Sequence, residues 1–284
     1  MEASARAERL ADRAVRALVA EALLTPKPAL VDQRGRGAHH DLDLDRLLRS
    51  AEALRGSFHR MALHAAGREP DLALRETLGA IGREGEQHML CATGGSNAHR
   101  GAIWVLGLLV AALACARAPR AAGTIAGIAA GLARLPDRNA PRVPTNGSRA
   151  CARFGVSGAR GEAAAGFPHV LELGLPALRR ARAGRGDETC ARLDALMAIM
   201  ANLVDTCLLH RGGWPAVSAA QRGARRVLSK GGTATAAGWR ALIALDAELL
   251  RRHASPGGCA DLLAACLFLD EVQSEACVRV SWNH

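Results

Sequence analysis

The amino-acid sequence predicts an all-α protein built as a single compact multi-helix domain, and three observations carry this prediction. Apolar residues recur at helical spacing along most of the chain, for example at Leu193, Leu196, Met197 and Met200. No segment alternates apolar and polar residues for long enough to predict a β-strand. Clusters of polar residues interrupt the apolar pattern at predicted helix ends. We therefore expect an active site where several helix ends meet.

The first helix is predicted from an apolar stripe at Leu10, Ala14, Leu18 and Ala22. It ends near Thr25, because a proline disfavours helix at the preceding residue and lacks a backbone donor. Further helices are predicted over residues 43–66, 71–91, 98–117, 121–134, 160–165, 169–182, 187–210, 214–228, 232–253 and 257–274. Residues 135–150 are predicted to form an irregular surface loop or lid, and residues 271–284 are weakly patterned. We expect residues 1–284 to form one catalytic domain.

The composition favours a globular protein with an anionic substrate or partner. The chain is 49% hydrophobic and 23% charged, which is ordinary for a protein with a sizeable core. Its formal net charge is +10, and nearly all of the positive charge is arginine, the better side chain for bidentate phosphate recognition. Only 3% of the residues are aromatic, which leaves few stacking platforms for single-stranded nucleic acid. The charge therefore suggests an anionic substrate or partner, and we do not expect nucleic acid in this role.

The cysteines and the N-terminus indicate a cytoplasmic protein. None of the eight cysteines forms a Cys-x-x-Cys pair, and the chain begins with a charged amphipathic segment rather than a secretory signal. The longest uncharged stretch, residues 101–116, is shorter than the roughly 18 to 20 residues needed to cross a bilayer. We predict no membrane partner, while a homodimer stays open.

The first polar cluster follows the first helix. Lys27 lies between two prolines, which restricts where its ammonium group can reach. Asp32, Asp41 and Asp43 supply the hard oxygen ligands that Mg²⁺ takes beside substrate phosphates. The alternative interpretation is that Asp41 or Asp43 caps the helix that starts there.

The second cluster contains the first of two His-Arg-Gly tripeptides and precedes the most apolar helix. Glu86 lies upstream of it, and Asn97, His99 and Arg100 flank the start of the helix. Unsatisfied backbone N–H groups at a helix N-terminus attract anions, and an arginine adds a fixed positive charge. We interpret this segment as an anion site, although Asn97 alone is also explained as a helix cap.

The second tripeptide follows Asp205 and places His210 and Arg211 before two glycines. A histidine and an arginine before glycine also form an ordinary signal for the end of a helix.

Two further clusters are candidate ligand-binding segments. Arg160 and Glu162 lie among three glycines, or form a solvated ion pair in a flexible loop. Ser255 is predicted to cap a helix whose Gly257 and Gly258 leave bare amides for a phosphate.

Taken in order, these clusters resemble the triphosphoribosyl-dephospho-CoA synthase family. The similar segments are TPKPALVD (25–32), GAHHDLD (37–43), GGSNAHRGA (94–102), GARGEAAAGFP (158–168), DTCLLHRGG (205–213) and SPGGCADLLA (255–264). The malonate decarboxylase branch resembles the chain more closely than the citrate lyase branch. The chain departs from the family pattern at Ala29, Ala98 and Cys207, where the family usually has Gly, Thr and Asn.

The resemblance implies transfer of the 5-triphosphoribosyl group of ATP to the 2′-hydroxyl of 3′-dephospho-CoA, with release of adenine. The product would be the prosthetic-group precursor of a malonate decarboxylase acyl carrier protein, passed on to a separate carrier-protein transferase. Because glycosidic bond cleavage builds oxocarbenium character, nearby carboxylates would stabilise the reaction.

Each candidate residue has a role in this hypothesis. Asp32, Asp41 and Asp43 would hold Mg²⁺ and the triphosphate. The phosphate clamp would be Lys27, Arg100, Arg160 and Arg211, with Asn97, Glu162, Ser255, Gly257 and Gly258 as further binding residues. Glu86 or Asp205 would stabilise the ribosyl cation or accept the hydroxyl proton. His99 or His210 would protonate the departing adenine.

Two other functions use the same features. A Mg²⁺-dependent N-glycosyl hydrolase of the ADP-ribosyl type would need similar carboxylates and would release a free sugar. A basic nucleic-acid-binding helical protein would show a steep salt dependence of binding. The carboxylates at helix ends argue against the second alternative, because binding alone does not need them.

Overall fold

The computed structural model describes residues 2–116, 121–184 and 187–281, and it confirms the all-α prediction. In these ranges there is no β-strand beyond one isolated bridge between Asp32 and Gly35. The helices are α1 (Glu2–Leu23), α2 (Leu44–Ala53), α3 (Arg55–Ala65), α4 (Leu72–Thr93), α5 (Arg100–Cys115), α6 (Ala122–Arg134), α7 (Asn146–Phe154), α8 (Gly158–Ala164), the π-helix η1 (His169–Gly174), α9 (Leu175–Ala183), α10 (Glu188–Met200), α11 (Thr206–Ser229), α12 (Ala236–Arg251) and α13 (Gly257–Ser281).

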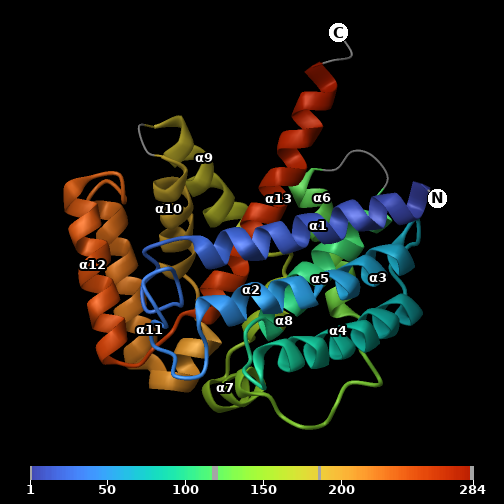
Figure 1. Cartoon of the computed structure of the whole chain (residues 1–284), viewed down its shortest axis with the longest axis horizontal. Helices are drawn as coiled ribbons and strands as arrows, with labels where there is room; N and C mark the ends of the chain where they lie inside the picture. Colours follow the sequence, from blue (N-terminus) through green and yellow to red (C-terminus); the bar gives the residue numbers. More distant parts are fainter. Residues whose placement is uncertain (1, 117–120, 185–186, 282–284) are drawn as a thin grey trace.

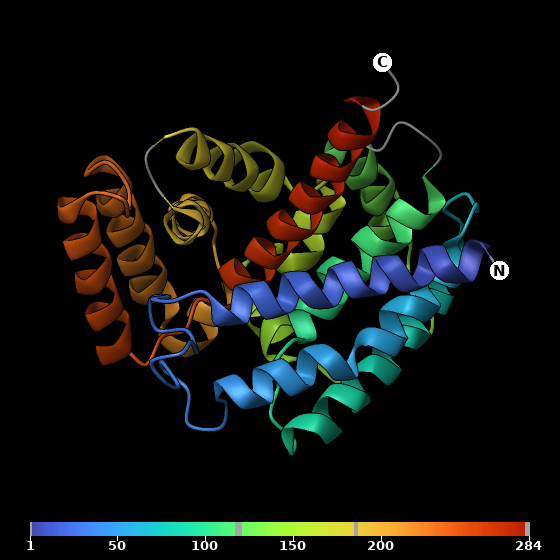
Figure 2. The same ribbon diagram turned by 45° about the horizontal axis from the view of Figure 1, so that its top comes forward.

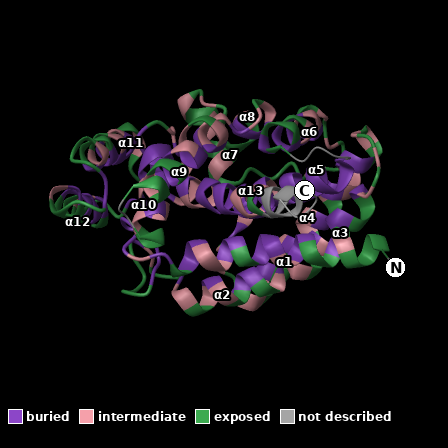
Figure 3. Ribbon diagram, turned by 90° about the horizontal axis from the view of Figure 1, so that it is seen from above, coloured by how far each residue is buried: buried purple, intermediate pink, exposed green. Residues whose placement is uncertain are grey.

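The apolar helix α5 lies in the middle of the molecule. It packs against α3, α6 and α13, and nearly all of its residues from Ala102 to Cys115 are buried. Helices α1 and α2 lie along one side of it, and the α11–α12 hairpin lies at the end of the molecule opposite the N-terminus (Figures 1 and 2). Buried faces of these helices turn toward one common interior (Figure 3), so the helices share one extended core.

Side-chain caps explain where many helices begin. Each capping side chain accepts a hydrogen bond from a backbone N–H of the first turn, which would otherwise lack a partner. The capping residues are Asp43 for α2, Asp71 for α4, Thr145 for α7, Asp187 for α10, Asp205 for α11 and Thr235 for α12. The interpretation of Asp43 as a helix cap is therefore confirmed.

The structure corrects four predicted boundaries. The helix expected over residues 43–66 is divided at Leu54, and the one expected over 187–210 is broken at residues 201–205, where Asp205 starts a new helix. The irregular loop expected over 135–150 is wrong at its end, because Thr145 caps the short helix α7 and residues 146–150 are helical. The weakly patterned C-terminus continues α13 to Ser281.

The connection between α1 and α2 is folded back on itself and anchored to α12. Arg34 donates to both Asp32 and Asp246, and Asp246 also accepts from the Ala29 N–H at 2.8 Å. Ala29 is fully buried with φ 55°, a left-handed conformation that costs a side-chain-bearing residue roughly 1–2 kcal/mol. This backbone explains why the family that the chain resembles usually has glycine at this position.

None of the helices in the described residues combines the length and apolar character needed to cross a membrane.

Candidate active site

A cavity of about 160 Å³ opens between the α1–α2 connection and the N-termini of three helices, α5, α11 and α13. Its polar lining residues are Glu21, Lys27, His39, Asn97, His99, Arg100, Cys207, Arg211, Ser255 and Asp261. The helices that supply these residues are far apart in the sequence, so tertiary packing alone assembles the cavity. The cavity lies where several helix ends meet.

Lys27 lines the cavity, and its charge is already paired with a carboxylate. Its side chain is 1% exposed, and its ammonium group donates to the Glu21 carboxylate at 2.6 Å and to the Glu21 carbonyl at 2.7 Å. A buried pair of this kind is retained because removing either partner would leave an uncompensated charge. Glu21 was missed in the sequence, since it falls within the regular pattern of the first helix.

His99 is held in the cavity wall with one ring nitrogen free. Its Nδ1 lies 2.7 Å from the hydroxyl of buried Ser50, whereas its Nε2 is buried and has no hydrogen-bond partner. Burial, and then the charge of Lys27, lower the pKa of His99 to about 3. The neutral form of the His99 imidazole is therefore favoured near pH 7.

Arg100 and Asn97 form one edge of the cavity. Asn97 Oδ1 accepts from the Arg100 backbone N–H at 3.2 Å, although the N-cap residue of α5 is His99 and not Asn97. The Arg100 guanidinium donates to Glu86 at 2.6 Å. Glu86 does not itself line the cavity, and its carboxylate pairs with Arg100.

Asp261 lines the cavity and lies against the first turn of α5. A side chain at Gly101 would overlap the Asp261 carboxylate, which explains the glycine of the first tripeptide. Burial, then the charges of Glu21 and Asp205, raise the pKa of Asp261 well above its usual range, although the Ala102 N–H opposes the shift. The sequence contained this residue in its last motif, but the apolar pattern around it concealed its role.

Asp205 does not line the cavity, and its carboxylate is hydrogen-bonded to backbone N–H groups. It is 1% exposed, and its two carboxylate oxygens accept from the N–H groups of Cys207 at 2.7 Å and Cys259 at 2.9 Å. A Cβ atom at Gly258 would lie 3.1 Å from this carboxylate. The bare backbone at Gly258 therefore makes room for the Asp205 carboxylate.

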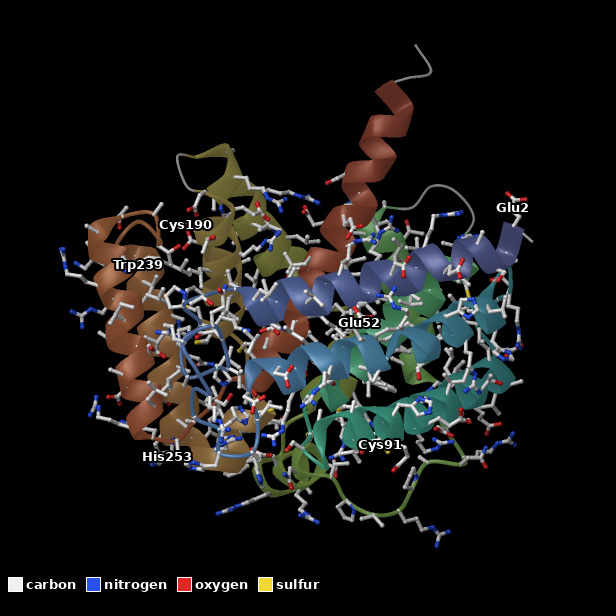
Figure 4. All side chains as sticks on the ribbon, in the orientation of Figure 1. Glu2, Glu52, Cys91, Cys190, Trp239 and His253 are labelled. Atoms are coloured by element: carbon white, nitrogen blue, oxygen red, sulfur yellow. The ribbon has the colours of Figure 1, made fainter. Side chains whose placement is uncertain are left out.

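Arg211, His39 and Ser255 form a polar chain along the opposite edge. Arg211 donates to the Ala38 carbonyl and to His39 Nδ1, both at 3.1 Å, and His39 Nε2 lies 2.9 Å from the Ser255 hydroxyl. Burial and the charge of Arg211 lower the pKa of His39 to about 4. Figure 4 shows His253 at the end of the α11–α12 hairpin, next to this edge, where its carbonyl lies 3.5 Å from Arg211.

The three aspartates expected to hold Mg²⁺ are not brought together. Asp32 is 2% exposed and bound to Arg34, Asp43 caps α2, and the Asp41 side chain is 64% exposed. Within the described residues, no three histidine, cysteine or acidic side chains form a group that could hold a metal ion. The expected three-carboxylate site is therefore wrong as a shared ligand set.

The remaining expected residues lie outside the cavity. His210 is exposed on α11, and its neighbour Gly213 has φ 60° and ψ −160°, a kink that supports the interpretation of this tripeptide as a helix end. Arg160 is exposed on α8. Glu162 is buried and pairs with His169 Nδ1 at 2.7 Å, which raises the pKa of His169. Gly257 does line the cavity, in contact with Cys207.

Comparisons with known proteins identify relatives over nearly the whole chain. Residues 7–279 match the family described as ATP:dephospho-CoA triphosphoribosyl transferase. A 2-(5''-triphosphoribosyl)-3'-dephosphocoenzyme-A synthase from Klebsiella pneumoniae is 53% identical over 272 residues, which cover 96% of this chain and 97% of that protein. Proteins named as probable members with the same activity are 56% identical in Pseudomonas fluorescens Pf-5 (98% of this chain, 96% of the relative) and in Azotobacter vinelandii (94% and 92%). No solved structure matches significantly.

Proposed function

The chain belongs to the ATP:dephospho-CoA triphosphoribosyl transferase family and is a transferase, and we propose that it moves the 5-triphosphoribosyl group of ATP to the 2′-hydroxyl of 3′-dephospho-CoA. Adenine is the other product of this reaction. In the Klebsiella relative the name states the same product, 2-(5''-triphosphoribosyl)-3'-dephosphocoenzyme A.

The observation that carries this proposal is the convergence of the family-like segments on one cavity. Residues from segments 25–32, 37–43, 94–102, 205–213 and 255–264 all line it. Segment 158–168 does not contribute a lining residue. These segments come from the α1–α2 connection and from the starts of α5, α11 and α13, so a shared structural role would not require them to meet around a polar opening.

The charges of the cavity suit a nucleoside triphosphate. Arg100 and Arg211 lie at two of its edges, and arginine presents a planar fork of donors that matches phosphate oxygens. The unpartnered Nε2 of His99 is available for a hydrogen bond to the bound nucleotide, because a buried polar atom without a partner is costly unless a ligand completes it. The Lys27–Glu21 pair closes the floor.

In the proposed reaction, Mg²⁺ would bind together with the ATP phosphates. Mg²⁺ is commonly bound through substrate phosphates with one or two protein carboxylates and retained waters. Asp32 and Asp43 are already engaged by Arg34 and by the start of α2, so these side chains do not fit a shared metal site. We derive no step through a metal ion held by them.

The wider biological setting follows the sequence expectations. We propose one catalytic domain in the cytoplasm, where the free thiols of the described cysteines would stay reduced. The product would pass to a carrier-protein transferase that serves malonate decarboxylase.

Deleting the gene in its host should then leave the malonate decarboxylase carrier protein without its prosthetic group, which mass analysis of that carrier protein would detect. A citrate lyase carrier that loses its group instead would assign the other branch. Gel filtration of the purified protein would decide whether it forms a homodimer.

The decisive experiment incubates the purified protein with ATP, Mg²⁺ and dephospho-CoA and analyses the products by mass spectrometry. We expect adenine and triphosphoribosyl-dephospho-CoA in equal amounts, and no adenine when the acceptor is omitted. Free triphosphoribose without an acceptor would assign the chain as an N-glycosyl hydrolase instead. No adenine under any condition would overturn the proposal.

A further inference from the structure

We propose that Asp261 is the general acid of the transfer reaction, which gives its proton to the departing adenine. The inference rests on the proposed function, because it assigns the proton donor for that reaction. Asp261 takes the acid role that the sequence assigned to His99 or His210, since His99 is neutral and His210 lies outside the cavity.

Geometry places Asp261 where a donor is needed. Its side chain lines the same cavity as Glu21, Lys27 and His99. Gly101 gives the carboxyl group access to the first turn of α5, because any larger residue would overlap it. The free Nε2 of His99 marks the same space as one that a polar ligand completes.

The charges around Asp261 favour its protonated form. Glu21 is paired with Lys27 at 2.6 Å, so its negative charge faces Asp261 while its own partner is a different residue. Among the residues that the structure describes, no cation forms an ion pair with Asp261. Two carboxyl groups in one site separate into an ionised one and a protonated one, and such pairs commonly divide the acid and base roles.

The other titratable groups of the cavity are poor proton donors. The pKa of His99 is about 3 and that of His39 about 4, so both rings are neutral. Burial raises the pKa of the Cys207 thiol well above its usual range, which makes the thiol too weak an acid. Lys27 is held by Glu21 through its ammonium group.

The proposed step balances without a further reactant. The electron pair of the bond between C1′ of the ribose and N9 leaves with adenine, and the Asp261 proton moves to a ring nitrogen of the purine. The 2′-oxygen of dephospho-CoA forms the new bond to C1′. The proton that this hydroxyl loses returns to the Asp261 carboxylate, which restores the acid for the next turnover.

The test compares Asp261→Asn with the unaltered protein on two substrates. With ATP, we expect the variant to release adenine about 10²- to 10⁴-fold more slowly, the usual contribution of a general acid. With 7-methyl-ATP, whose base carries a positive charge and leaves without a proton, we expect a loss of less than about 10-fold, since the acid step is bypassed.

Three controls keep the outcomes distinct. Asp270→Asn removes another carboxylate of α13, one that pairs with Arg182 outside the cavity, and should keep the rate with ATP. Asp261→Glu restores a carboxylic acid and should recover part of the rate. Thermal unfolding of each variant shows whether it folds.

Equal losses with ATP and 7-methyl-ATP in a folded Asp261→Asn variant, or an undiminished rate with ATP, would overturn the acid assignment. If the unaltered protein itself releases no adenine from ATP and dephospho-CoA, the proposed function fails instead. The two failures are therefore distinguishable in the same assay.

Discussion

The two His-Arg-Gly tripeptides have the same three residues and opposite placements. In the first, His99 is 4% exposed inside the cavity wall, and Gly101 lies against Asp261. In the second, His210 is exposed on α11, and only Arg211 reaches the cavity, where it binds the Ala38 carbonyl. The first tripeptide starts a helix, whereas the second ends a helical segment at the Gly213 kink.

The difference shows that position relative to a helix end decides which residue of a tripeptide meets the site. Before the N-terminus of α5, the histidine turns inward to Ser50, and the glycine exposes its backbone to a carboxylate. Within α11, the histidine lies on the outer face and the arginine crosses to the loop that follows α1. The same residues therefore predict a site in one context and a helix end in the other.

The largest expected effect separates the two histidines. His99→Asn keeps a partner for Ser50 and removes the free Nε2, so we expect kcat/KM to fall by about 10- to 100-fold, the value of one buried hydrogen bond of roughly 1–3 kcal/mol. His210→Asn should stay within about twofold, because exposed substitutions away from a site have small effects. Steady-state release of adenine measures both. Equal losses in the two variants would mean that His99 and His210 do not differ in their contribution to the reaction.

A second comparison concerns Gly101. Gly101→Ala should destabilise the protein by about 1–3 kcal/mol, the cost of forcing an extra methyl group into a packed interior, since its methyl group overlaps Asp261. Gly123→Ala, in an open position of α6, should instead stabilise it by up to about 1 kcal/mol. Urea denaturation gives both values. A neutral Gly101→Ala would mean that α13 can move away from α5 freely.

Replacing the arginines of the two tripeptides should have different effects on substrate binding and on stability. Arg100→Gln and Arg211→Gln should each raise KM for ATP about 10-fold, the loss of one charge-assisted contact with phosphate of roughly 1.5 kcal/mol. Only Arg211→Gln should also lower the melting temperature, because Arg211 anchors the α1–α2 connection through Ala38 and His39. Initial rates and calorimetry separate the two effects. An unchanged KM in either variant would remove that arginine from the nucleotide site.

The smallest expected effect is a slope in stability against pH. The pKa of His99 falls from 6.5 to about 3 on folding, so between these values the unfolded chain binds a proton that the folded chain does not. This contribution to stability is complete above pH 6.5 and is lost as the pH falls toward 3. From pH 7 to 5, we therefore expect the free energy of unfolding to decrease less steeply in His99→Asn, by up to about 1.4 kcal/mol per pH unit. His210→Asn is the control and should follow the unaltered protein. Parallel curves for all three would contradict burial of a neutral imidazole.

The sequence predicted the helices well and the site by segment rather than by residue. The long apolar run of α5 made this helix evident, whereas the short helix α7 depends on the Thr145 cap more than on its pattern. The segments that meet at the cavity were identified because histidine, arginine and glycine are unusual beside apolar helices. Glu21 and Asp261 were not, because an acidic residue on a helix has the same spacing whether it faces solvent or a cavity.

The roles of the other carboxylates could not be predicted for a related reason. Asp32, Asp43 and Asp205 each satisfy a helix start, a backbone N–H or an arginine in the folded chain. Their partners lie in other segments or in backbone groups that all residues possess, so the sequence gives no sign of which oxygen atoms are already occupied. Metal ligands and helix caps use the same side chains, and only the tertiary structure distinguishes them.

The contact between Asp205 and the backbone at Gly258 also has a consequence for descent. The two residues belong to helix starts that the hydrogen bond from Cys259 joins across 54 positions of sequence, and a side chain at 258 would crowd the carboxylate. A lineage that replaced the aspartate would free the glycine to vary. We therefore expect position 258 to vary among relatives only where position 205 has lost its aspartate, and an alignment of distant relatives would test this.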